Sequence, residues 1–382
     1  MKKKLLAIAA IAATLPAAHA VDIKAGNWDL SVGGNANTFY TATTCSGDVV
    51  SGVALGSKAL ACGDKSKSTT IGNGLLPSMV NVGAKTSEGG YDVSAVVGIG
   101  VAVATDSSIA QNSVVDVRNA YFTVGNKDMG TVKMGRDYGL FGLHAVLNDM
   151  TLLGVGSATQ GTQNGRVSLG HLGAGYVYAG TYGQAVYTTP SFGGVNVDVG
   201  LMSPVKPYAQ FGEAEASGPA VQARATYAGQ GYKLWAANKS QDFTSYRMSA
   251  SEVGGSFGSG PFGLVANYQT GKGVGLLADG DQGNVKSTNT FVQATYKATS
   301  KLKLGVGVGK GTNDGTPYGA NAAATASEAK NLRSNQNTTV AAYYNLTTSF
   351  TAVGELGNTT SKGFDGKEGK QNSIAVGGIF FF

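Results

Sequence analysis

The feature that most constrains the fold of this chain is a strict alternation of side chains over residues 301–310. The run Lys-Leu-Lys-Leu-Gly-Val-Gly-Val-Gly-Lys places its leucines and valines on one face of an extended strand. Two lysines and three glycines occupy the opposite face. About ten residues make one tilted strand across a bilayer, whereas strands of soluble proteins usually have about 5–6 residues. The run therefore predicts a membrane-spanning β-strand.

The same period of two recurs elsewhere. It is clear at residues 221–227, at 350–356 and at 374–382, where it continues to the last residue. Glycine supplies 58 of the 382 residues, and each glycine inside a helix costs roughly 1 kcal/mol. With 42% hydrophobic residues, 17 tyrosines and 14 phenylalanines, the chain is too apolar for a disordered protein. We therefore expect an ordered, all-β protein rather than a helical repeat or coiled coil.

The amino terminus has the three parts of a secretory signal peptide. Lysines at residues 2–4 precede an apolar stretch at 5–15, and Ala-His-Ala at 18–20 forms a small-x-small cleavage site. We expect cleavage before Val21, which leaves residues 21–382 as a single barrel domain. Loss of the three lysines lowers the formal charge from +6 to +3 and removes the chain's cluster of basic residues, so nucleic-acid binding is not expected.

Short and long connections alternate between the predicted strands. The short ones lie at residues 87–90, 126–129, 191–194, 229–231, 259–261, 299–300 and 346–348. The long ones lie at residues 42–75, 138–180, 202–217, 270–286, 311–336 and 359–370. Tight turns on one side and long loops on the other are typical of transmembrane barrels. We predict an antiparallel β-barrel of about sixteen strands, which begins near Trp28 and ends at Phe382.

Four segments resemble the general porins of Gram-negative outer membranes. They are residues 117–125, 130–139, 187–195 and 342–349, and Phe382 is similar to the terminal aromatic residue that the barrel assembly machinery reads. The resemblance implies a sixteen-stranded homotrimeric barrel in the outer membrane, with the third long loop folded into the pore. It also implies contact with outer-membrane lipid and lipopolysaccharide, and passage of small ionic solutes.

The resemblance also suggests residues for the pore constriction. Arg118 matches a family arginine on the wall, and Asp149 stands where the family has an acid in the third loop. Two departures are visible: an apolar residue replaces the family's loop glutamate, and Asn81 occupies a position where the family often has another arginine. With one acid fewer in the loop, we expect a preference for anions.

Other basic residues are assigned by parity along their strands. Lys85, Lys133 and Arg224 share a face with polar or glycine residues, and a lipid-facing charge at mid-depth costs roughly 2–4 kcal/mol. We therefore predict that these three side chains point into the pore. Arg136 has the outward parity of its apolar neighbours, which fits either a local bulge or a contact with a neighbouring subunit.

Cys45 and Cys62 are the only cysteines, and both lie in the first long loop. In an oxidising compartment such a pair is expected to form a disulfide. Their spacing fits no zinc or thioredoxin motif, so we expect them to brace the loop.

Catalytic and metal-binding motifs are weak. Residues 254–258 match the hydrolase pattern G-x-S-x-G, but both histidines after the signal peptide, His144 and His171, lie upstream of it. Asp279 and Asp281 lack a following glutamate at the spacing of a calcium loop. We predict no cofactor, no metal site and no enzymatic activity.

The sequence thus favours an outer-membrane channel for passive diffusion of small hydrophilic solutes and ions. The nearest alternative is a substrate-specific porin for small anions on the same barrel. Alternatives from other classes are an outer-membrane barrel hydrolase and a soluble or fibrous secreted β-protein.

Overall fold

The computed structural model describes residues 21–50, 62, 65–104, 115–163, 166–206, 218–244, 246–315 and 332–382. The predicted signal peptide, residues 1–20, lies outside the described residues. The strands before the inward loop are β1 (Val21–Ala25), β2 (Trp28–Gly47), β3 (Lys67–Gly72), β4 (Ser78–Glu88), β5 (Tyr91–Val101), β6 (Val115–Asn126) and β7 (Gly130–Tyr138). The inward loop contains α2 (Leu143–Asn148), η1 (Met150–Leu153), β8 (Ser157–Gln163) and β9 (Arg166–Gly170). The remaining strands are β10 (Thr181–Thr188), β11 (Val195–Met202), β12 (Ala220–Gly229), β13 (Tyr232–Asp242), β14 (Arg247–Ser259), β15 (Phe262–Lys272), β16 (Lys286–Lys297), β17 (Leu302–Asn313), β18 (Leu332–Asn345), β19 (Phe350–Gly363) and β20 (Glu368–Phe381).

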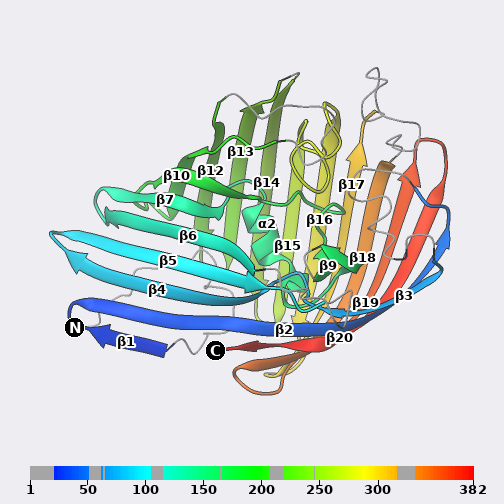
Figure 1. The fold of residues 1–382 in the computed structure, drawn as a ribbon, viewed down its shortest axis with the longest axis horizontal. Helices are drawn as coiled ribbons and strands as arrows, with labels where there is room; N and C mark the ends of the chain where they lie inside the picture. Colours follow the sequence, from blue (N-terminus) through cyan, green and yellow to red (C-terminus); the bar gives the residue numbers. More distant parts are fainter. Residues whose placement is uncertain are drawn as a thin grey trace.

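The main sheet closes into a barrel (Figure 1). Of its eighteen strands, the short strands β1 and β3 pair only with β2, and the other sixteen form the ring. Sequential strands pair antiparallel, β7 pairs with β10 across the inward loop, and β20 pairs with β2 to close the ring. The predicted all-β, sixteen-stranded antiparallel barrel is confirmed. No helix among the described residues is long and apolar enough to cross a membrane.

The two ends of the described chain meet along one edge of β2. β20 pairs with residues 35–47 of β2, and β1 pairs with residues 28–32 of the same strand. Between them, the backbone of Phe382 exchanges hydrogen bonds of 2.8 and 3.1 Å with Gly34. β1 thus continues the line of β20, and both ends lie at the same side of the barrel (Figure 1).

The seven predicted short turns are confirmed. The strands leave only residues 89–90, 127–129, 189–194, 230–231, 260–261, 298–301 and 346–349 between them at this end of the barrel. At the other end, the long connection expected at residues 359–370 is wrong. β19 and β20 stay paired as far as Lys362 and Glu368, because polar side chains remain compatible with a strand once it leaves the membrane.

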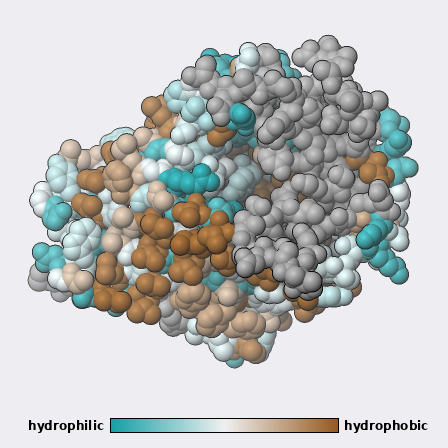
Figure 2. Space-filling view, viewed as in Figure 1, coloured by the Kyte–Doolittle hydropathy of each residue, from teal (hydrophilic) through white to brown (hydrophobic). Residues whose placement is uncertain are grey.

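The outer surface of the barrel is apolar. Figure 2 shows apolar side chains gathered over the region of β4 to β6, where Val80, Val82, Val97 and Ile99 are each at least 40% exposed. Aromatic side chains ring the turn end, and contacts such as Phe262 against Tyr296, with ring centroids 5.1 Å apart, join neighbouring strands. An apolar band edged with aromatic residues matches the lipid-facing surface of a transmembrane barrel.

Candidate functional site: the lumen and its inward loop

Loop 3, defined as residues 139–180, leaves the wall after β7 and folds into the barrel. Figure 1 places α2 inside the ring of strands. Leu140, Phe141, Ala145 and Met150 are each less than 5% exposed, although a surface loop would leave them in water. The predicted inward fold of the third long loop is confirmed.

Polar side chains of the wall accept hydrogen bonds from the backbone N–H groups of loop 3. The N–H groups of Leu140 and Phe141 donate to Gln222, that of Gly142 to Glu252, that of Met150 to Gln293, those of Val155 and Gly156 to Glu355, and that of Val177 to Gln269, over 2.6–3.0 Å. We call these five wall residues the anchor residues. A buried N–H without a partner costs about 1–3 kcal/mol, so the anchor residues make the inward position of the loop possible.

The glycine face of β17 allows loop 3 to lie flat against the wall. A Cβ added to Gly305 would overlap the Met150 sulfur, one on Gly307 would lie 2.9 Å from the His171 ring, and one on Gly309 would overlap the Ala174 carbonyl. The three glycines of the alternating run therefore serve close approach of the loop, since any larger residue would displace it.

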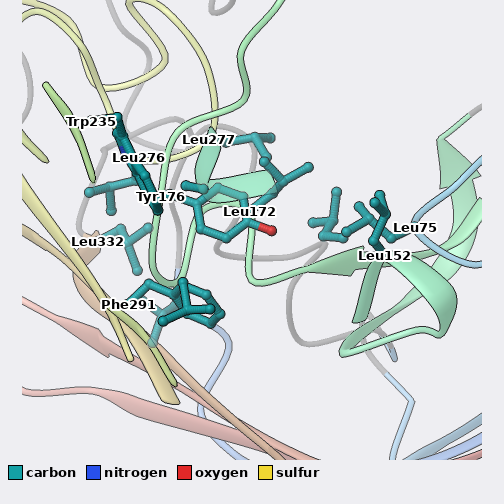
Figure 3. Packing of buried hydrophobic residues seen from close by; sticks show 13 residues of the cluster. Leu75, Leu152, Leu172, Tyr176, Trp235, Leu276, Leu277, Phe291 and Leu332 are labelled. Atoms are coloured by element: carbon teal, nitrogen blue, oxygen red, sulfur yellow. The ribbon is translucent and has the colours of Figure 1, made fainter. Parts of the chain in front are cut away.

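An apolar cluster fills the space between loop 3 and the wall. In Figure 3, Tyr176 of loop 3 lies near Phe291 of β16 and Leu276 of the β15–β16 loop, residues 273–285. At the other end of the same cluster, Leu152 of loop 3 lies beside Leu75. Tyr176, Leu276 and Phe291 are fully buried. This side of the lumen is consequently packed like a protein core rather than filled with water.

The β15–β16 loop also folds inward, which the sequence did not indicate. Asp279 accepts hydrogen bonds from Lys239 and from the Tyr182 hydroxyl, and the backbone of Tyr178 donates to Leu277. Burial raises the pKa of Asp281 to about 6, although its carboxylate accepts backbone N–H groups of its own loop. Two inward loops, joined to each other, narrow the lumen.

Asp149, the predicted loop acid, lies inside loop 3 rather than at its surface. Its carboxylate accepts hydrogen bonds from Tyr176 at 2.6 Å and the Thr151 backbone at 2.9 Å, and lies 2.9 Å from His171 Nδ1. Burial alone would raise the pKa of this carboxyl, but His171 and these hydrogen bonds hold the pKa of Asp149 below its usual value. Because its side chain is fully buried, this acid braces the loop and does not face lumen water.

Arg118 lies on β6, on the wall opposite the strands that carry the anchor residues, at the edge of loop 3. A register shift in the β5–β6 pairing allows both Arg118 and Asn119 to turn inward, and this β-bulge explains the irregular alternation of the sequence there. The guanidinium donates to the Asp116 carboxylate at 2.5 and 2.8 Å and to the Tyr178 hydroxyl at 3.3 Å. Arg118 thus has an acidic partner that sequence analysis did not assign.

Two further basic residues of the predicted constriction are also paired. Lys133 lies 2.5 Å from Asp137 on the same face of β7, and Arg224 lies 2.8–2.9 Å from Asp198 on the neighbouring strand β11. Both pairs lie on the inner face of the barrel, and Lys133 is the more exposed of the two basic residues. Each contributes little net charge to the lumen.

Asn81 and Lys85 occupy the inner face of β4 and are less enclosed. Asn81 is half-buried, whereas Lys85 is exposed and stands opposite Asp29 in the β2–β4 register. Asp29 itself pairs with Lys24. The registers place Asn81 level with Asn119, next to Arg118, because both pair with Gly98 of β5, whereas Lys85 lies nearer the turn end.

Arg136 points outward from β7. The pairing of β7 with both β6 and β10 continues through this residue without a register shift, so the bulge considered from the sequence is absent. The exposed guanidinium donates to the Thr181 hydroxyl at 3.4 Å.

Cys45 is bonded to Cys62, and no described cysteine is free. The expectation that both cysteines lie in the first long loop is wrong for Cys45, because β2 continues to Gly47 and pairs Cys45 with Gln371 of β20. Ser256, the serine of the hydrolase-like motif, lies within β14 on an extended strand. That position lacks the strand-to-helix turn that a hydrolase nucleophile requires.

The wall is apolar outside and polar inside, and its lumen is narrowed by an inward loop. These features define a pore-forming protein of the outer membrane. A profile of the Gram-negative porin family matches residues 7–363. The chain belongs to this family, and family and fold together indicate an outer-membrane channel rather than an enzyme.

Solved structures with the same fold are distant in sequence. The channel DcaP of Acinetobacter baumannii is 17% identical, with a TM-score of 0.68 over 94% of this chain and 99% of that one. An anion-selective porin from Comamonas acidovorans is 15% identical, with a TM-score of 0.63 over 93% and 100%. OmpF of Salmonella typhi is 14% identical, with a TM-score of 0.62 over 95% and 100%. The search of curated proteins gave no match.

Proposed function

We propose that this protein lets small hydrophilic solutes and ions diffuse passively through the lumen beside loop 3. The observation that carries the proposal is the unequal filling of the barrel. Anchor residues such as Gln269 and Glu355 are buried under the loop, whereas Asn81, Tyr121 and Lys133 on the opposite wall remain half-buried. A polar, water-accessible wall opposite a fixed loop is suited to size exclusion.

Channel formation is tested in planar lipid bilayers. The purified protein should produce discrete conductance steps that scale with salt concentration, because the pathway is aqueous. Heat-denatured protein from the same preparation is the control. Absence of steps from natively folded protein would contradict the proposal.

We also propose a modest preference for anions. Arg118, Lys133 and Arg224 have acidic partners, so the excess positive charge falls to Lys85, Lys233 and Lys303, which form no ion pair within the described part of the chain. At an effective dielectric of 20, a unit charge at 4 Å acts on an ion with about 4 kcal/mol, and water in the pore reduces this. The selectivity named for the Comamonas acidovorans porin is consistent with this preference. A cation-selective reversal potential in a potassium chloride gradient would contradict it.

The assembly that we propose is a homotrimer embedded in outer-membrane lipid and lipopolysaccharide. One of the similar structures, OmpT of Vibrio cholerae, is described in a trimer form. Arg136, exposed among apolar neighbours, would contact either an adjacent subunit or a lipid headgroup. A trimer that resists SDS until it is boiled is the expected result.

For export and assembly, we propose cleavage before Val21 and recognition of Phe382 by the barrel assembly machinery. Amino-terminal sequencing of the outer-membrane protein should begin at Val21. Deletion of Phe382 should lower the yield of inserted protein, since the residue also exchanges backbone hydrogen bonds with Gly34. An unchanged yield would contradict the role of the terminal aromatic residue.

A further inference from the structure

A pocket of about 340 Å³ lies between loop 3 and the turn end of the barrel. Its volume falls at the lower end of the roughly 300–1,000 Å³ typical of small-molecule sites. Leu147, Leu152 and Leu153 of loop 3 and Val265 of β15 supply apolar lining. The pocket can therefore accommodate the apolar part of a small molecule. The passage of ions through the lumen does not require such an apolar surface.

Two lysines frame this pocket. Lys233 stands at the start of β13 and Lys303 at the start of β17; both are half-buried, and both line the pocket. Neither forms an ion pair among the described residues, in contrast to Arg118, Lys133, Arg224 and Lys239. Lys303 Nζ lies 4.8 Å from the centroid of the Tyr343 ring, which orients the ammonium without neutralising it.

The acidic side chain that lines the same pocket does not present its charge to it. Asp149 lines it, but the Asp149 side chain is fully buried and its carboxylate is bonded to Tyr176 and Thr151. The hydroxyl-bearing residues Ser256 and Thr295 contribute further polar lining. Positive charge and hydroxyl groups beside an apolar floor are complementary to an anion that carries an apolar body.

We propose that this pocket binds small organic carboxylates with an apolar body, with the carboxylate at Lys233 or Lys303 and the body against the loop 3 leucines. The proposal goes beyond passive diffusion, because it requires saturable binding. It does not depend on conduction, since the pocket exists in the isolated barrel.

The test is isothermal titration of the detergent-solubilised protein with benzoate, using titration into empty micelles as background. Acetate has the carboxylate without the body, and benzamide has the body without the charge. Benzoate should bind about tenfold more tightly than either. Loss of one charged hydrogen-bond donor is worth about tenfold, so Lys233→Gln and Lys303→Gln should lower benzoate affinity, at least one of them by that factor.

Lys301→Gln is the matched control, because Lys301 is exposed in the adjacent turn and the substitution removes the same charge without touching the pocket. Its affinity for benzoate should equal that of the wild type. Wild-type affinity in both pocket variants, or equal binding of acetate and benzoate, would overturn the proposal. Folded protein that conducts ions but binds no benzoate would refute the pocket alone, and protein that binds benzoate without conducting would refute the channel alone.

Discussion

The inner faces of two groups of strands differ in what they contact. The anchoring wall, which we define as β12 and β14–β19, presents Gln222, Glu252, Gln269, Gln293 and Glu355 to the backbone of loop 3, and all five are at most 5% exposed. The open wall, β4–β7, presents half-buried side chains such as Asn81, Tyr121 and Lys133, and its buried Arg118 and Asp137 form ion pairs within the wall. The difference shows that inward polarity serves two purposes. Side chains of one wall satisfy the backbone of a buried loop, and those of the other wall face the lumen.

The anchoring role is tested most severely by Glu355→Ala. The substitution leaves the N–H groups of Val155 and Gly156 and the hydroxyl of Tyr343 without their acceptor. At about 1–3 kcal/mol for each group, the bound position of this part of loop 3 should be lost. We expect lower thermal stability and a larger or noisier single-channel conductance.

Glu355→Gln is the conservative control, since it keeps one acceptor oxygen and should retain most of the wild-type conductance. Asp137→Asn makes a comparable change on the open wall and should leave loop 3 in place. Equal melting temperature and conductance in Glu355→Ala and wild type would remove the distinction between the walls.

A smaller disturbance of the same contact is Gly309→Ala. The new methyl group would overlap the Ala174 carbonyl of loop 3, and overpacking of this kind costs about 1–3 kcal/mol. Gly83→Ala is the matched change on the open wall, where the methyl group meets the single flexible side chain of Ser31. Thermal unfolding should show a clear loss for Gly309→Ala and little for Gly83→Ala. Similar losses in both variants would contradict the closer packing of loop 3 against the anchoring wall.

Much of the barrel is predictable from sequence because lipid imposes a simple requirement on every strand. Residues such as Leu304 and Val306 must face outward. The alternation of apolar and polar residues therefore predicts the number of strands, where the barrel begins and ends, and all seven short turns. The lumen imposes no comparable pattern. Asp149 finds His171 and Tyr176 more than twenty residues away, and no local period indicates these contacts. The sequence does not distinguish the anchor glutamines from other polar residues that line the pore.

Acid should weaken the packing of loop 3 through His144 of α2. This ring packs against Trp235, with centroids 5.4 Å apart, and lies near Arg224 and Lys233. Burial, followed by the charges of Arg224 and Lys233, lowers the pKa of His144 to about 2, whereas the unfolded value is near 6.5. The unfolded state therefore binds the proton more readily between these values, and stability falls as pH drops below about 6.5, by at most 1.4 kcal/mol per pH unit.

Melting temperatures measured from pH 7.5 to 5 should show this loss in the wild type and a smaller loss in His144→Gln. The open wall carries no histidine among its described residues. Any change of single-channel conductance with pH in this range should therefore come from loop 3. Identical pH profiles for wild type and variant would contradict the role of His144.

The open wall is tested by the Arg118–Asp116 pair. Arg118→Ala leaves an uncompensated carboxylate and should shift the reversal potential toward cations, whereas Asp116→Asn leaves an uncompensated guanidinium and should shift it toward anions. Because lumen water screens both charges, we expect changes of severalfold in the permeability ratio. Shifts of the same sign in both variants would contradict a paired charge at the pore.

The smallest effect is expected from reduction of the Cys45–Cys62 bond, which joins the end of β2 to the first loop, outside both walls. A separation of 17 residues corresponds to about 3 kcal/mol of loop-closure entropy. This constraint acts on the loop, while Cys45 itself stays paired to Gln371 of β20 by the register of the barrel.

Treatment with a reductant should therefore leave conductance and selectivity unchanged and make the segment between the two cysteines easier to cleave by protease. Cys45→Ser together with Cys62→Ser should behave as the reduced protein does. A change in conductance on reduction would mean that the first loop, and not only loop 3, shapes the pathway.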